Sequence, residues 1–212
     1  MEQLPFLSKA AFAVAIDGLI AQLDEHSAGL RYQTRHSPHD PSDIYLEITR
    51  PITLSVPSST ATAIPTCIPD MATAVAVDEA SDAESLAVLQ PTEEPSAPAP
   101  TVCYHIVLSP IYAVPTLYLT VTPPLHDLQA LHDALVPTDQ RDAVRDVGVQ
   151  GAISQTEHPY VQRVCWFVHP CRTAEAMQVW VGEGGLTLDR YLGLWLGVVG
   201  RAVGLTVPLR TS

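Results

Sequence analysis

The chain has 212 residues, of which 47% are hydrophobic and only 16% are charged, so it can form one domain with a sizeable core. Its formal net charge of −12 argues against sequence-independent binding to nucleic acid or to an anionic membrane, both of which need basic patches. No secretory signal opens the chain, and the uncharged apolar run 191–200 is too short to span a bilayer. The uneven placement of the cysteines is not typical of a disulfide framework. We therefore expect a cytoplasmic protein without nucleic acid, stable membrane insertion or a disulfide framework.

The N-terminal part of the chain predicts a helix followed by two antiparallel strands. Apolar residues at helical spacing follow Ser8, a suitable N-cap, and continue to Leu23. Strand-like runs over 30–35 and 43–49 flank a turn-rich segment. Apolar and polar residues alternate in the second run, which is typical of a strand with one face buried.

The composition changes between residues 56 and 100. This segment is rich in Ser, Thr, Ala and Pro, contains clustered acidic residues and has no aromatic residue. Such a segment cannot bury enough apolar surface to offset the entropy of ordering. We therefore expect one domain over 1–212, with a sheet interrupted by a disordered acidic insertion at 56–100.

The second half of the chain predicts more strands and then several helices. The pairs His126-Asp127 and His132-Asp133 are expected on the solvated face of a helix, opposite its leucines. Strands with helices gathered at one end indicate an α+β fold with a mainly antiparallel sheet. The expected elements are strands at 102–108 and 116–121, a leucine-bearing helix over 125–135, a helix from Thr138 to 147, a strand at 162–168, and helices at 173–181 and 188–199.

One junction between a strand and a helix holds the residues best suited to chemistry. The apolar run that ends at Val168 is followed directly by His169, Pro170 and Cys171. Proline fixes its own φ and biases the preceding residue toward extended geometry, which restrains the direction of the thiol. If Thr173 caps the following helix, Cys171 lies just outside a helix N-terminus, where the dipole favours a thiolate. A thiol beside a histidine is a candidate nucleophile, and a half-buried structural cysteine is the alternative reading.

The same region offers four residues that can bind zinc, namely His158, Cys165, His169 and Cys171. Neither a CxxC nor an HxxxH pair is present, and Cys165 lies within an apolar run, so we do not predict a metal site. A papain-like hydrolase places its cysteine before its histidine in the chain, which is the opposite order. No organic cofactor is predicted either.

Three parts of the sequence together resemble one family. They are YHIV at 104–107 with YAVPTLY at 112–118, ISQTEHP at 153–159 with FVHPC at 167–171, and WLGVVG at 195–200 with VGL at 203–205. This combination is similar to the autophagy-related E2-like conjugating enzymes that carry a His-Pro-Cys motif. The resemblance covers most of residues 100–209 and is absent from the insertion. It implies an E2-like fold, with an antiparallel meander, an N-terminal helix and C-terminal helices.

The resemblance also implies acyl transfer at Cys171. An E1-like activating enzyme would pass a ubiquitin-like modifier to this thiol as a thioester, and a lysine of an acceptor protein would then attack it. His169 would act by positioning or electrostatically and only weakly as a base, while Pro170, Ser154 and Gln155 would shape the site. Ordinary ubiquitin E2 enzymes use an asparagine ahead of the cysteine. This chain contains no asparagine, so another group has to stabilise the oxyanion.

Two alternative functions stay open. A sister family that conjugates its modifier to a membrane lipid also carries His-Pro-Cys, but it usually continues with a histidine where this chain has Arg172-Thr173, and its insertion is longer. The other alternative is a catalytically silent E2-like module that only presents an acceptor protein. Lys9 is the only lysine of the chain, which fits an enzyme that has to avoid modifying itself.

Overall fold

The computed structural model describes residues 3–26, 29–54, 99–138, 141, 153–182 and 186–207. These residues belong to one compact unit. The expected disordered insertion lies outside the described residues except for its last two positions, 99 and 100. The helix expected from Thr138 to 147 also lies outside them, apart from Thr138 and Arg141.

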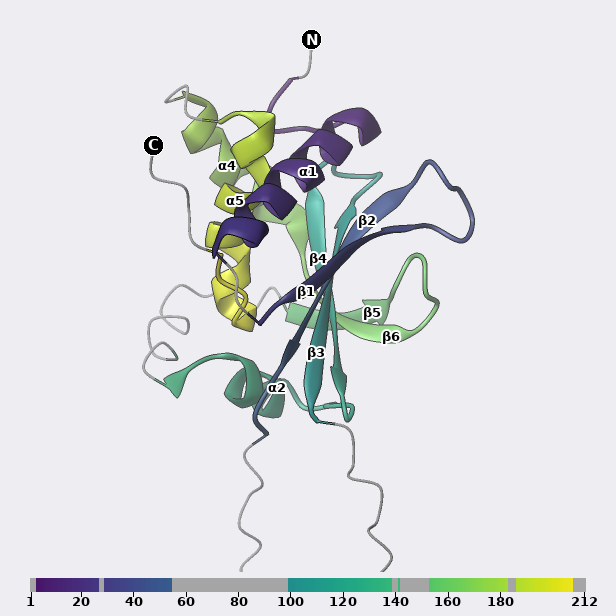
Figure 1. Cartoon of the computed structure of the whole chain (residues 1–212), viewed down its shortest axis with the longest axis vertical. Coiled ribbons are helices and arrows are strands. Elements are labelled where there is room, and N and C mark those ends of the chain that lie inside the picture. The colour runs from purple at the N-terminus through teal and green to yellow at the C-terminus, as the bar shows by residue number, and fades with distance from the viewer. Residues whose placement is uncertain are drawn as a thin grey trace, which may run out of the picture. The chain divides into compact units, whose positions relative to one another are not determined.

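Six antiparallel strands form one sheet in the order β1-β2-β3-β4-β6-β5 (Figure 1). The first four strands pair with their neighbours in sequence, whereas β6 pairs with β4 and leaves β5 at the edge. The structure confirms every predicted strand and adds β5, which shows no alternation because only Ile153 of it is buried. The strands are β1 (Arg31–His36), β2 (Ile44–Pro51), β3 (Thr101–Leu108), β4 (Pro115–Thr122), β5 (Ile153–Glu157) and β6 (Val164–Val168).

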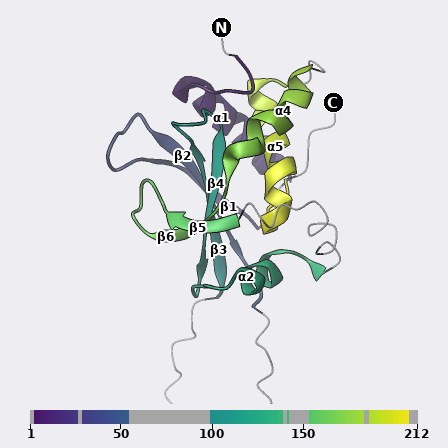
Figure 2. The same ribbon diagram turned by 180° about the vertical axis from the view of Figure 1, so that it is seen from behind.

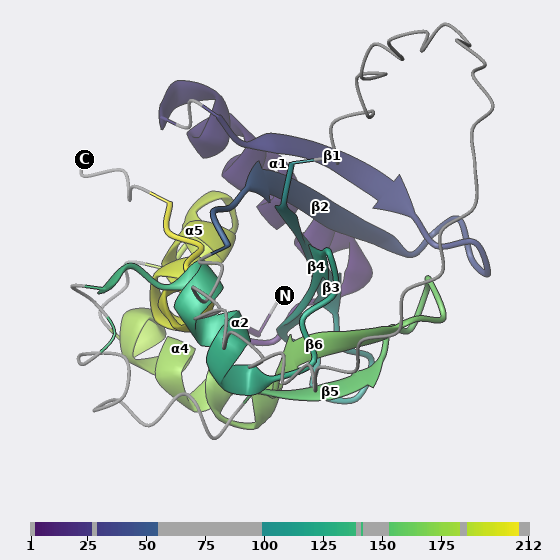
Figure 3. The ribbon, with the colours of Figure 1, turned by 90° about the horizontal axis from the view of Figure 1, so that it is seen from below.

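The long helices gather on one side of the sheet, as the view from below shows (Figure 3). The helices α1 and α5 pack against each other, and α4 lies beside α5 when the molecule is seen from behind (Figure 2). This arrangement confirms the predicted α+β fold with a mainly antiparallel sheet. The helical elements are α1 (Lys9–His26), α2 (Leu128–Leu135), the short 3₁₀ turn η3 (Pro170–Arg172), α4 (Thr173–Gly182), α5 (Leu188–Val199) and the 3₁₀ turn η4 (Gly200–Val203).

The predicted start of α1 and its contact with α5 follow from the local sequence. The Ser8 hydroxyl accepts the backbone N–H of Ala11 at 3.2 Å, which caps the helix as expected. Gly18 lies where α5 crosses, because a Cβ at this position would come within 2.3 Å of the Asp189 carbonyl oxygen. A glycine is therefore required for the two helices to approach each other.

One prediction about α2 is wrong. His126 is exposed and Asp127 caps the helix, but His132 is buried and not on a solvated face. His132 follows Leu128 by four residues and precedes Leu135 by three. Residues at these spacings share one face of a helix, so His132 lies on the apolar stripe.

The single lysine begins α1 and lies over the turn between β1 and β2. Its Nζ atom is 2.5 Å from Asp43 Oδ1 and 3.3 Å from Asp40 Oδ2. The hydrogen bond to Asp43, followed by the one to Asp40, raises the pKa of Lys9. Among the described helices, none has both the length and the hydropathy that crossing a bilayer requires.

Candidate active site

The end of β6 delivers Cys171 to the surface on a tight turn. Strand β6 ends at Val168, the next residues form η3, and η3 continues directly into α4. Pro170 is buried and occupies the first position of the turn, where its fixed φ is suitable and no backbone N–H is needed. His169 and Cys171 on either side of it are exposed.

The N-cap of this helical segment is His169, which corrects the prediction of Thr173. The His169 Nδ1 atom accepts the backbone N–H of Cys171 at 3.1 Å, and its φ and ψ of −65° and 126° are non-helical. Thr173 is already helical, with φ −62° and ψ −46°, and its N–H donates to the Pro170 carbonyl. The 3₁₀ turn and α4 form one continuous segment, so Cys171 lies in its first turn and not outside it.

This hydrogen bond decides which nitrogen of the neutral His169 ring carries the proton. Because Nδ1 accepts the Cys171 N–H, the proton lies on Nε2. The ring therefore presents an N–H donor to its surroundings and has no free lone pair to act as a base.

Two aromatic rings flank His169. The Tyr112 ring, from the connection between β3 and β4, lies 5.9 Å away at 69°, and the Phe167 ring from β6 lies 5.9 Å away at 52°. The backbone around Tyr112 is itself held, because Ala113, at φ 50°, accepts the Leu7 N–H at 2.8 Å. Sequence reasoning did not place Tyr112 at the site, although it lies in the segment 112–118 that carries the resemblance. Only the pairing of β4 with β6 brings it to the site.

Ser154 and Gln155 lie on the edge strand β5 and point to opposite faces of the sheet, as successive strand residues do. Ser154 is paired with Phe167, so it lies one strand away from a ring that contacts His169. The side chain of Gln155 donates to the carbonyl of His126 at 3.4 Å and faces away from Phe167. Both residues are exposed, and their contribution to the site remains a prediction.

The described cysteines differ sharply in their surroundings. Cys171 is exposed, Cys103 is half-buried and Cys165 is buried. Burial raises the pKa of Cys165 to about 11, and its thiol donates to the Thr156 carbonyl. Burial also raises the pKa of Cys103. Of these three thiols, Cys171 is the one that a macromolecular reactant can reach.

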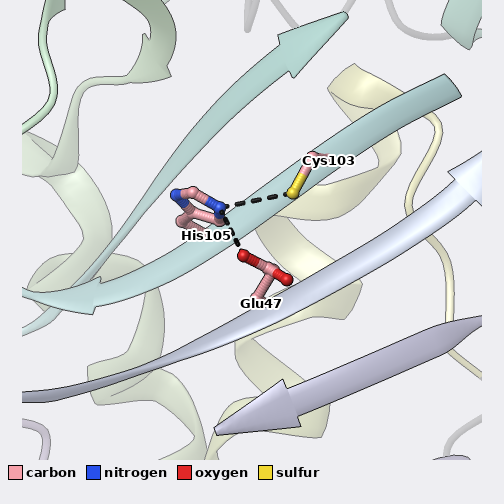
Figure 4. Close-up of side chains that lie close together, drawn as sticks. All are labelled: Glu47, Cys103 and His105. Atoms are coloured by element: carbon pink, nitrogen blue, oxygen red, sulfur yellow. Dashed lines mark hydrogen bonds and ion pairs between the residues drawn. The ribbon is translucent and has the colours of Figure 1, made fainter. Parts of the chain in front are cut away.

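In the described parts of the chain, one group of three side chains brings metal-binding atoms close together: Glu47, Cys103 and His105 (Figure 4). His105 Nε2 lies 3.3 Å from Cys103 Sγ and 3.4 Å from Glu47 Oε2. His105 Nδ1 is also 2.9 Å from Nε2 of His158, the only one of the four residues considered for zinc that contacts this group.

Hydrogen bonds account for this cluster without a metal ion. The Nδ1 atom of His158 accepts the backbone N–H groups of Tyr160 and Val161, at 3.1 and 3.2 Å. The proton of neutral His158 therefore lies on Nε2 and is donated to His105 Nδ1. His105 then carries its own proton on Nε2, directed at Glu47 and Cys103, whereas a metal ion would need that nitrogen deprotonated. The residues present do not fit a metal centre in this hydrogen-bonded state.

Comparisons with known proteins agree with the resemblance. The family described as "Autophagocytosis associated protein, active-site domain" matches residues 11–210 of the chain. The ubiquitin-like-conjugating enzyme ATG10 of Gibberella zeae is 34% identical over 135 residues, which cover 61% of this chain and 55% of the relative. The enzymes of the same name from Homo sapiens and Arabidopsis thaliana are 31% identical over 110 residues and 30% identical over 114 residues, each covering 50% of both chains. The chain spans about half the length of the curated relatives it matches.

Proposed function

Because the chain belongs to the family of autophagocytosis-associated active-site domains, we propose that it is an E2-like conjugating enzyme of autophagy whose nucleophile is Cys171. One observation carries this proposal beyond the family: the thiol is exposed on a turn whose backbone is fixed by His169. A proline on one side and a helix on the other hold the thiol at the surface. The protein would act in the cytoplasm.

The proposed reaction consists of two acyl transfers. The Cys171 thiolate attacks the thioester that joins the C-terminus of a ubiquitin-like modifier to an E1-like enzyme, and the E1 thiolate leaves. The amine of an acceptor lysine then attacks the new thioester, the Cys171 thiolate leaves, and the amine loses a proton to solvent. The product is an isopeptide bond, and neither step needs a metal ion or an organic cofactor.

His169 and Pro170 have complementary roles in this proposal. Pro170 sets the turn, and His169 orients the amide of Cys171 through Nδ1. The remaining N–H at Nε2 is a donor for the negative charge that develops on the thioester oxygen, which is the task of asparagine in ordinary E2 enzymes. A neutral histidine with its Nδ1 atom occupied can supply such a donor, and the chain has no asparagine to do so.

Charging by an E1-like enzyme tests the proposal. Incubation of the chain with the E1-like enzyme, the modifier and ATP should give an adduct that reductant removes. Cys171→Ala should abolish the adduct, and Cys171→Ser should give an ester that resists reductant. Cys103→Ala and Cys165→Ala are matched controls and should still be charged. If no adduct forms while the E1-like enzyme itself is charged, the chain is the silent binding module.

A second experiment, which starts from the charged chain, distinguishes a protein acceptor from a lipid acceptor. A lysine-bearing acceptor protein should receive the modifier, whereas vesicles containing an aminophospholipid should not. Transfer to the lipid alone would favour the sister activity and overturn the proposed protein acceptor.

A further inference from the structure

The strand that leads to the nucleophile is paired with the main part of the sheet over only a short stretch. Strand β6 is paired with β4 at three positions, from Leu117↔Val168 to Leu119↔Trp166. By contrast, β3 and β4 are paired from Thr101↔Thr122 to Leu108↔Pro115. The far end of the β5–β6 hairpin, around residues 158–163, therefore extends beyond its pairing with β4. Since η3 follows β6 immediately, a shift of β6 along or out of the sheet is transmitted to Cys171.

His158 supplies a second attachment at the far end of the hairpin. Its side chain is 1% exposed, and its ring makes two kinds of hydrogen bond. Nδ1 accepts the N–H groups of Tyr160 and Val161 and so closes the hairpin turn. Nε2 reaches past β4 and lies 2.9 Å from Nδ1 of His105 on β3. His158 thus ties the hairpin to the centre of the sheet by a hydrogen bond, beside the ring contact between Tyr160 and Tyr45 of β2.

The hydrogen bond between the two histidines belongs to a series of hydrogen bonds that extends across the sheet to its opposite edge. His105 directs Nε2–H at Glu47 of β2 and at Cys103, as Figure 4 shows. Glu47 in turn accepts from Arg35 of β1 at 3.2 Å and from Gln33 of the same strand. Both nitrogens of each imidazole ring have a partner in this series, so the series fixes the orientation of both rings.

Ring packing connects the same histidine to the active site. The Tyr118 ring lies 4.9 Å from the His158 ring and 6.0 Å, stacked at 21°, from the Phe167 ring. Phe167 in turn contacts His169 at 5.9 Å. A continuous row of four rings therefore runs from the hairpin turn to the histidine that holds the Cys171 amide. Burial, with a further contribution from the nearby His105, lowers the pKa of His158 to about 4, so the ring is neutral under ordinary conditions.

We propose that His158 is a positioning residue, which through its bond to His105 fastens the β5–β6 hairpin and so keeps Cys171 and His169 in reactive geometry. This inference rests on the proposed function of Cys171. His158 does not touch the reacting atoms and acts through β6 and the ring row. A displacement of about 1 Å at a reacting group can reduce a rate by about a hundredfold, so a loose hairpin has a large kinetic effect.

Two substitutions of His158 separate its two hydrogen bonds. In His158→Asn, the side-chain oxygen takes the place of Nδ1 and still closes the turn, but the shorter side chain cannot reach His105. In His158→Gln, the terminal amide takes the place of Nε2 and donates to His105, but it does not close the turn. His39→Asn, at an exposed position in the turn between β1 and β2, is the matched control.

The readouts are single-turnover transfer of the modifier to Cys171 and hydrogen exchange of the amides in the hairpin. We expect the Asn variant to transfer at least about tenfold more slowly at saturating E1. The concentration of E1 that gives half the maximal rate should not change, and hydrogen exchange over 153–168 should be faster. The Gln variant should recover most of the transfer rate, and His39→Asn should match the wild type in every readout.

The two proposals fail in different ways. If the wild-type chain forms no adduct, the proposed function is wrong. If the wild type is charged and the Asn variant, shown to be folded by its thermal unfolding, transfers equally fast, the positioning role is wrong. A Gln variant that is no faster than the Asn variant also overturns it, because the link to His105 would then have no effect.

Discussion

At the residue scale, three contacts restrain the ring of His169 although the residue is exposed. One nitrogen is committed to the Cys171 amide, and aromatic rings lie on two sides. The Cys171 backbone N–H is used in the same bond, so it is not available to an oxyanion. The Nε2–H of His169 is a side-chain donor on the exposed turn, and the lack of asparagine is explained if that donor replaces it.

Substitutions of His169 should separate orientation from charge stabilisation. His169→Asn keeps an acceptor for the Cys171 N–H and an amide donor, whereas His169→Ala removes both. We expect alanine to slow discharge of the modifier from Cys171 onto free lysine by about a hundredfold and asparagine by less than about tenfold. The measurement is single-turnover discharge after the E1-like enzyme has been inactivated. Equal rates for alanine and the wild type would exclude a catalytic role for the ring.

The central residues of the site could be predicted because they are contiguous in the sequence. His169, Pro170 and Cys171 form one motif, and their chemistry is local. Tyr112 could not be predicted, because it comes from a different connection and reaches His169 only through the pairing of β4 with β6. The N-cap was assigned to Thr173 because threonine is a common cap, but the tight proline turn places the N-cap four residues earlier, at His169.

At the scale of elements, the attachment of the β5–β6 hairpin to the rest of the sheet is sensitive to acid. The pKa of His158 is lowered from 6.5 to about 4, and burial lowers that of His105 as well. The unfolded chain therefore binds more protons than the folded chain between these two pH values, so the free energy of unfolding falls as the pH drops below 6.5. The pKa of Glu47, which burial raises, is lowered on balance by its hydrogen bonds to Gln33 and Arg35, and this carboxylate becomes protonated only at lower pH.

Urea unfolding at different pH values checks this sensitivity. Between about pH 6.5 and pH 5, the wild type should lose about 1 kcal/mol per pH unit more than His158→Asn, which has no imidazole at this position. Above about pH 7.5 the pH dependence of the two proteins should be parallel. Parallel curves over the whole range would mean that folding does not shift the pKa of His158.

The elements with strong periodicity could be predicted from the sequence, and those defined by their partners could not. The helices α1 and α5 and the strands β2, β3 and β4 repeat apolar residues at the spacing of their own structure. Strand β5 is short, exposed and recognisable only from its pairing with β6. Tyr45 of β2 alternates with the core residues of its strand and is nevertheless buried, because the hairpin turn covers it with Tyr160.

At the scale of the whole molecule, the chain leaves the sheet and returns to it at almost the same place. Pro51 at the end of β2 is paired with Thr101 at the start of β3, and the Ile52 N–H donates to the Pro100 carbonyl at 2.9 Å. The ends of any connection between these strands are therefore already close together. The domain does not need a long segment here to form its sheet.

Deletion of residues 60–98 should leave both folding and charging intact. Five residues after Leu54 remain to close the turn, and closure of a shorter loop costs less entropy, so we expect a gain of about 1–2 kcal/mol in stability. Thermal unfolding and the formation of the reductant-sensitive adduct measure the two effects. Loss of charging in a variant that unfolds cooperatively would show that the segment binds a reaction partner.

The way in which the only lysine is held has a consequence for the interpretation of conjugation products. An amine attacks a thioester only after it has lost its proton, and two aspartates keep Lys9 in the ammonium form. No other lysine is present in the chain to compete with the acceptor. A reductant-resistant product in a mixture with the wild-type chain therefore indicates that the modifier has reached another molecule. The usual control, in which every lysine of the enzyme is replaced, needs only one substitution here, Lys9→Arg.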